Sequence, residues 1–202
     1  MTAIPLENRS PASGRASAAG PAVATYLALG LVVAVRWQIF RTGMLDGVTE
    51  GLVFGLALIG IAWLGGLSPS IPALGPLTSG LAAGGALVAL SLLARGPLPP
   101  MALGHAAPFL PWVAVTTLVA TGEELVLRGT LWRWTAAVAG DAAALLVTSV
   151  LFALIHVPVY GPSVMPLDFG VGLLFGGLRL WFGGPAAPAA AHVLADLATW
   201  WL

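Results

Sequence analysis

The sequence PFLPWVAVTTLVATGEELVLR, residues 108–128, decides the class of fold, because a long apolar run ends in a cluster of charged side chains. The 27 uncharged residues 96–122 suffice for a helix that crosses a bilayer, which takes about 20 mostly apolar residues. Of the 202 residues, 58% are hydrophobic and 8% are charged, whereas soluble domains carry about 25% charged residues. We therefore predict an integral membrane protein.

Similar apolar stretches recur along the chain and predict an all-α, polytopic bundle of about seven to eight transmembrane helices. The predicted spans are 22–35, 47–66, 78–94, 108–134, 141–156, 169–182 and 188–202. Residues 1–20 are rich in Ser, Ala, Gly and Pro, and we expect them to form a flexible tail. The N-terminal helices would occupy 21–107 and a C-terminal core 108–202, within one membrane domain over 21–202.

Charge and cysteine content exclude several classes of function. Eight basic and eight acidic residues give a formal net charge of zero, so no basic surface is predicted to bind nucleic acid. The absence of cysteine excludes disulfides, thiolate metal sites and cysteine nucleophiles. No Gly-x-Ser-x-Gly elbow is present, so a serine hydrolase has little support. Every basic residue is Arg, and with the heavy use of Ala and Gly this indicates a bacterial source and hence the inner membrane.

The first motif whose side chains could take part in a reaction is Glu123-Glu124-Leu-Val-Leu-Arg128. Ionisable residues inside membrane helices are costly and usually face a cavity, so they mark functional sites. Glu124 and Arg128 are four residues apart on one helix face, which favours an ion pair. Glu123 lies about 100° around the helix from Glu124 and is free of that partner. We predict that Glu123 is a general base.

Two further motifs place histidines at the same spacing. Phe152-Ala-Leu-Ile-His156 puts a ring and an imidazole on one helix face, and His192-Val-Leu-Ala-Asp196 does the same for an imidazole and a carboxylate. Imidazole and carboxylate groups move protons or bind metals. Each motif alone is also compatible with a structural role, since a lone histidine often bonds a backbone carbonyl. We predict that the three motifs meet around one polar pocket.

Taken in this order, the three motifs resemble those of the CAAX-protease and bacteriocin-processing family (Abi or CPBP family) of intramembrane endopeptidases. The resemblance covers about residues 108–202. It implies that Glu123 and His156 activate a water that attacks a peptide carbonyl. It also implies that His192 and Asp196 hold the oxyanion or a metal, and that the substrate is a peptide or protein in the lipid membrane. The supporting residues that it implies are Glu124, Arg128 and Phe152.

Position 196 departs from the family pattern, because the prenyl-protein processing members commonly carry Asn there. A charged Asp cannot donate a hydrogen bond to an oxyanion. Asp196 therefore favours metal ligation or orientation of His192. The candidate metal site consists of Glu123, His156, His192 and Asp196, with Zn²⁺ as the candidate ion, and a metal-independent mechanism stays open.

Two other functions stay open. A non-catalytic member of the same fold would use the polar pocket for binding, as a scaffold or an immunity protein. A small proton-coupled transporter would use the ionisable groups as a relay, although no inverted repeat is visible. For a peptidase, the substrate could be a prenylated C-terminus, a bacteriocin leader or a bacterial membrane protein, and in a bacterium the first is the least expected.

Overall fold

The computed structural model describes residues 11–67, 71–95 and 107–202, and these residues form helices without any strand. A π-helical segment (Leu125–Leu131) joins α4 to α5 in one rod, and a short 3-10 turn (Pro162–Val164) precedes α7. In the described residues, the predicted all-α class is confirmed. The α-helices are α1 (Pro11–Thr42), α2 (Gly47–Leu64), α3 (Leu74–Arg95), α4 (Phe109–Glu124), α5 (Trp132–Ala139), α6 (Asp141–Tyr160), α7 (Met165–Phe182) and α8 (Ala186–Ala198).

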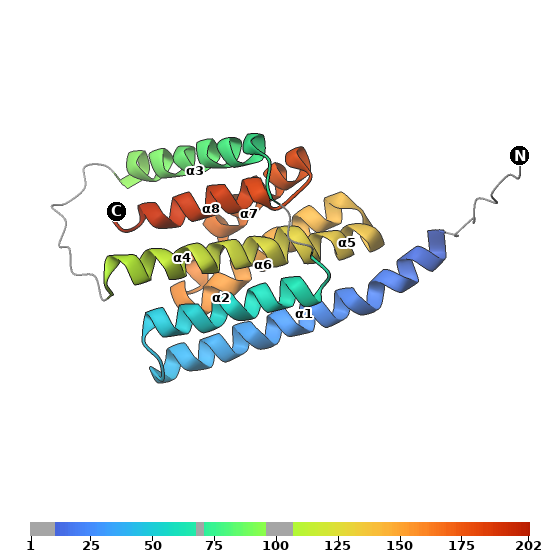
Figure 1. Cartoon of the computed structure of the whole chain (residues 1–202), viewed down its shortest axis with the longest axis horizontal. Helices are drawn as coiled ribbons and strands as arrows, with labels where there is room; N and C mark the ends of the chain where they lie inside the picture. The colour runs from blue at the N-terminus through green and yellow to red at the C-terminus, as the bar shows by residue number, and fades with distance from the viewer. Residues whose placement is uncertain (1–10, 68–70, 96–106) are drawn as a thin grey trace, which may run out of the picture.

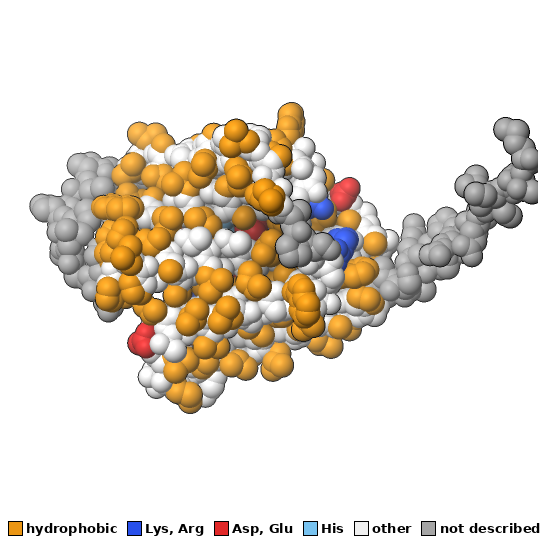
Figure 2. Space-filling view, in the orientation of Figure 1, with side chains coloured by type: hydrophobic (Ala, Val, Ile, Leu, Met, Phe, Trp, Pro, Cys, Tyr) orange, Lys and Arg blue, Asp and Glu red, His pale blue; other side chains and the backbone are white. Residues whose placement is uncertain are grey.

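The surface and the helix lengths are those of a protein solvated by lipid. Six helical segments of the described chain are long and apolar enough to span a membrane, the rod from α4 to α5 counting as one. The last helix, α8, is shorter, with 13 residues. Hydrophobic side chains are spread over the whole face shown in Figure 2, and many large ones are exposed along the described helices. The chain is therefore an integral membrane protein.

Several helices extend beyond their predicted boundaries. The helix α1 begins at Pro11 rather than after Pro21, and Pro21 lies inside it. The predicted tail is thus helical from residue 11 onward, and its residues 1–10 lie outside the described residues. The helix α6 continues through Pro158 to Tyr160. A proline inside an apolar helix removes one backbone N–H, and packing against neighbouring helices can compensate for it.

The helices form two layers that enclose the motifs. In Figure 1, α3, α8, α4, α2 and α1 lie side by side in this order. The helices α6 and α7 pack behind α4 and α8 in that view, where α7 contacts α8 and α6 contacts the π-helical segment. Buried side chains from both layers form the core between them, among them Leu58, Val126, Leu127, Phe152 and Phe175. The two layers therefore bring α4, α6, α7 and α8 together around one interior.

Close packing of α6 on α7 depends on Gly172. A Cβ atom at position 172 would lie 2.9 Å from Cα of Ser149 and 3.1 Å from its carbonyl oxygen, whereas nothing lies within 4 Å of the same atom at Gly177. Because the opposing atoms are backbone, we expect Gly172→Ala to lower the free energy of unfolding by about 1–3 kcal/mol. The measurement is the Tm of the full chain in detergent.

Gly177→Ala is the matched control, since Gly177 lies on the same helix and is exposed. Its Tm should stay the same or rise, because Ala favours a helix more than Gly does. Equal Tm values for the two variants would contradict the close approach of α6 and α7 at Gly172.

Candidate active site

Arg128 and Glu124 form a fully buried ion pair at the centre of the bundle. Nη1 of Arg128 donates to Oε1 of Glu124 at 2.9 Å, which confirms the pair predicted from their spacing. Nη2 of Arg128 donates to the carbonyl oxygen of Gly172 on α7 at 3.0 Å. The guanidinium carbon also lies 4.8 Å from the ring centroid of Phe152 on α6. These contacts hold the Glu124 carboxylate in a fixed position.

The π-helical segment begins directly after Glu124 and contains Arg128. Residues Val126–Leu131 are buried, so the segment contacts neighbouring helices on every side. The Arg128 carbonyl accepts a further hydrogen bond from Nε of Arg179 at 2.8 Å. Short π-helical turns are rare and occur frequently at functional sites. The first motif therefore lies on the least regular part of the described helices.

His192 on α8 is oriented by Glu124. Its Nδ1 lies 3.1 Å from Oε1 of Glu124, the same oxygen that accepts from Arg128. Because a carboxylate only accepts, Nδ1 carries the proton in the neutral ring and Nε2 keeps a free electron pair. The sequence predicted Glu124 as the partner of Arg128 alone and gave no sign of this second contact. Nε2 of His192 lies 3.4 Å from Oδ2 of Asp196, so these two side chains share a helix face as predicted.

His156 on α6 has the same tautomer as His192 in the neutral ring, with the free electron pair on Nε2. Its Nδ1 lies 2.7 Å from the carbonyl oxygen of Phe152, which can only accept, so in the neutral ring Nδ1 is again the protonated nitrogen. The rings of Phe152 and His156 lie 4.7 Å apart between centroids, as the four-residue spacing predicted. The free electron pair of His156 is therefore on Nε2.

Glu123 lies between the two histidines. Its Oε2 is 3.9 Å from Nε2 of His156 and 3.9 Å from Nε2 of His192. The side chain is 3% exposed, and within the described part of the chain Oε2 has no hydrogen-bond partner. One ligand atom from each of the three residues lies within 4.8 Å of the other two. The predicted convergence of the motifs is confirmed for these three residues, and Asp196 borders them with a side chain that is 42% exposed.

These three groups suit either a metal ion or a water molecule. Metal-ligating histidines usually bond a carboxylate or carbonyl through one ring nitrogen and the metal through the other, as both rings here are arranged to do. A buried carboxylate oxygen without a bonded partner supplies a further ligand. A water that bridges these groups would lie about 2.8 Å from each of the three atoms. The arrangement can thus hold a divalent ion or a water that gives a proton to Glu123.

Comparison with known proteins identifies the part of the chain that carries these groups. Residues 105–198 match the family model described as type II CAAX prenyl endopeptidase Rce1-like. These residues, named the Rce1-like segment below, are therefore similar to this family. The match agrees with the resemblance of the three motifs, and the Rce1-like segment contains Glu123, His156 and His192. No curated protein and no solved structure matches the chain.

The Rce1-like segment contains one further charged residue beside the site, Asp168, which lies outside the three sequence motifs. Its Oδ2 lies 3.9 Å from Nδ1 of His156. This oxygen is buried and, among the described residues, has no hydrogen-bond partner. Asp168 has no histidine at helical spacing, so only the fold brings it to His156. The available signal was an acidic residue next to an apolar stretch, the same signal that drew attention to Glu123.

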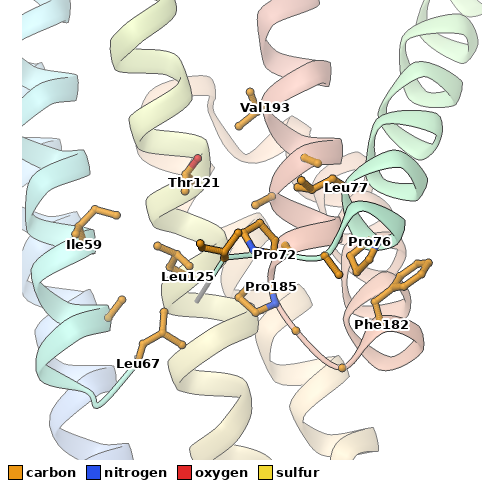
Figure 3. A pocket seen from close by; sticks show the side chains of 18 of the residues that line it. Ile59, Leu67, Pro72, Pro76, Leu77, Thr121, Leu125, Phe182, Pro185 and Val193 are labelled. Carbon is orange, nitrogen blue, oxygen red and sulfur yellow. The ribbon is translucent and has the colours of Figure 1, made fainter. Parts of the chain in front are cut away.

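A large apolar pocket of about 770 Å³ lies between α2 and α3 (Figure 3). Thr121 and Leu125 line it from the rod of α4, and Val193 lines it from α8. Glu123 is two positions from both Thr121 and Leu125, which places it about 200° around the helix from the pocket. His156 and His192 are not among the described lining residues either. The pocket is therefore separate from the candidate active site.

Proposed function

We propose that this protein is an intramembrane endopeptidase that hydrolyses a peptide bond of a membrane-associated substrate. The position of the Glu123 carboxylate carries the proposal. Its Oε2 is buried and lies 3.9 Å from the free nitrogen of each of two histidines. A purely structural role would not need two imidazole nitrogens directed at a third ionisable group. The match of residues 105–198 to the Rce1-like family model supports a peptidase of this kind.

In the proposed reaction, a water bound between Glu123 and His156 attacks the carbonyl carbon of the substrate. Glu123 accepts a proton from the water as its oxygen bonds to carbon, and the carbonyl electron pair moves onto oxygen. His192 and Asp196 border the resulting oxyanion or hold a metal ion. The proton then passes to the peptide nitrogen, the carbon–nitrogen bond breaks, and a carboxylic acid and an amine leave. Positioned proton transfer contributes roughly 10²- to 10⁴-fold to such a rate.

Zinc is the cofactor that these residues fit. A zinc ion would be held by His156 and His192 together with the carboxylate of Glu123 or Asp196. When bound, it would supply Lewis-acid activation of the water and the carbonyl group. Glu124 and the Phe152 carbonyl would keep the two imidazole rings in their orientations, as partners of ligating histidines do.

The wider setting of the reaction is also a proposal. The chain would form one membrane domain over residues 21–202 in the bacterial inner membrane, with the site in 108–202. Packing of α2 on α4 and of α1 on α5 supports a single domain. The substrate would be a peptide or a membrane protein, and nucleic acid would not be a partner.

The direct test is cleavage by the full chain after reconstitution in liposomes. A library of membrane-anchored peptides is added, half of them prenylated and half carrying the same sequences without the prenyl group. We expect mass spectrometry to find cleavage at a defined bond. If folded protein cleaves none of the peptides, a non-catalytic binding role is favoured instead.

Metal removal is expected to lower cleavage to the background rate. The two histidines and Glu123 would lose the ion that orders the water. The full chain is incubated with 1,10-phenanthroline, and 1,7-phenanthroline, which does not chelate zinc, serves as the control. Added zinc should restore the rate. Cleavage that persists in protein shown by elemental analysis to contain no metal would contradict the zinc site and favour a water activated by Glu123 and His156 alone.

A further inference from the structure

We infer that Asp168 is a positioning residue that holds His156 in the tautomer and orientation that the reaction requires. The inference rests on the proposed function, because it concerns the same site. Asp168 lies in the first turn of α7, and its Oδ2 is 3.9 Å from Nδ1 of His156. This oxygen is buried and has no hydrogen-bond partner within the described chain.

The surroundings of Asp168 connect it to the site rather than to a structural partner. A buried carboxylate is costly unless a nearby group compensates its charge. The titratable groups around Asp168 are His156, His192 and Asp196 of the candidate active site, together with Tyr160 at the end of α6. Nδ1 of His156 lies 3.9 Å from the carboxylate, and its N–H can compensate the negative charge. Asp168 therefore has its favourable interaction with that ring.

The connection between α6 and α7 places Asp168 beside His156. The chain turns at Gly161, whose φ of 83° lies in the left-handed region that favours glycine. The 3-10 turn Pro162–Val164 follows at once and leads into α7. The first turn of α7 thereby comes to lie next to the last turns of α6.

Asp168 acts on the choice between the two tautomers of His156. Nδ1 of His156 already donates to the carbonyl of Phe152 on its own helix. Asp168 adds a second oxygen on the same side of the ring, so the other tautomer would place an unprotonated Nδ1 opposite two oxygen atoms. The carboxylate thus keeps the proton on Nδ1 and the free electron pair on Nε2. Nε2 is the atom that faces Glu123.

The test combines a spectroscopic measurement with kinetics on the full chain in detergent micelles. The chain has three histidines, so ¹⁵N-histidine labelling gives a simple NMR spectrum, and loss of a signal in His156→Gln assigns that ring. We expect the wild-type His156 ring to carry its proton on Nδ1. In Asp168→Asn, part of the population should shift to the Nε2–H tautomer. The kcat should fall about 10- to 100-fold with little change in KM, and Asp168→Glu should recover part of it.

Asp141→Asn is the matched control. Asp141 also lies in the first turn of a helix, but its carboxylate accepts from Nε1 of Trp132 at 3.0 Å, and an Asn oxygen can still do so. The control should keep the His156 tautomer and kcat of the wild type. A wild-type His156 protonated on Nε2 would overturn the inference, and so would an unchanged tautomer in Asp168→Asn. The NMR measurement needs no substrate. A wild-type chain that cleaves no peptide would therefore count against the proposed function, while the NMR spectra would still show whether Asp168 controls the tautomer of His156.

Discussion

Glu123→Gln is expected to lower the rate of peptide cleavage by about 10²- to 10⁴-fold, the usual contribution of a general base. A glutamine has nearly the same shape as glutamate but does not accept a proton from water. Because the side chain is only 3% exposed, a solvent carboxylate or buffer base would not replace it. The measurement is the initial rate of cleavage in liposomes at saturating substrate.

The same substitution should leave the Tm unchanged or raise it, which separates loss of chemistry from loss of fold. The amide of Gln removes a buried carboxylate oxygen that lacks a hydrogen-bond partner in the described chain, and it can donate to Nε2 of a histidine. Asp46→Asn is the control for removal of an acidic group. Asp46 caps α2 by accepting from Val48 and Thr49, and Asn caps a helix equally well. Wild-type cleavage by Glu123→Gln would rule out Glu123 as the base.

Arg128→Met is expected to lower the free energy of unfolding by about 3–5 kcal/mol, because it leaves the buried carboxylate of Glu124 without its cationic partner. The substitution also removes the hydrogen bond to Gly172 that connects the rod of α4 and α5 to α7. The measurement is unfolding of the full chain in detergent. Cleavage should be lost as well, because Glu124 orients His192.

Two further variants make this prediction specific. The double variant Arg128→Met with Glu124→Gln removes both charges and should be less destabilised than Arg128→Met alone. Arg133→Met is the control on the same rod, since the guanidinium of Arg133 is exposed and binds the carbonyl of Gly66. Arg133→Met should lower the free energy of unfolding by about 1 kcal/mol. A Tm of Arg128→Met equal to that of Arg133→Met would contradict a central role for the buried pair.

The apolar runs and the four-residue spacings were sufficient to predict much of this structure. A chain segment that spans lipid must pair its own backbone N–H and C=O groups, because no water is present to bond them. Uncharged runs of the right length therefore predicted helices reliably. The pairs Glu124–Arg128 and Phe152–His156 followed from helical geometry alone. The confirmed convergence of Glu123 on both histidines followed from the cost of ionisable groups in lipid.

Features that depend on tertiary packing were not predictable in the same way. The contact of Asp168 with His156 depends on the path of the chain between two helices, which no periodic pattern records. The second role of Glu124, as the partner of His192, needs the crossing of α4 and α8. The continuation of α6 through Pro158 was missed because proline ordinarily ends helices in water, where backbone groups find other partners.

The π-helical segment Leu125–Leu131 holds about one residue more than regular α-helical winding would place over the same rotation. If one residue were deleted there and the rod returned to regular winding, the parts before and after it would keep nearly the same angular relation. Trp132 would still face Asp141, and Arg133 would still face the carbonyl groups at the end of α2. The same deletion in the regular part of α4 would rotate everything after it by about 100° and would break these contacts. A change in length by one residue should therefore be tolerated better in the π-helical segment than elsewhere on this rod.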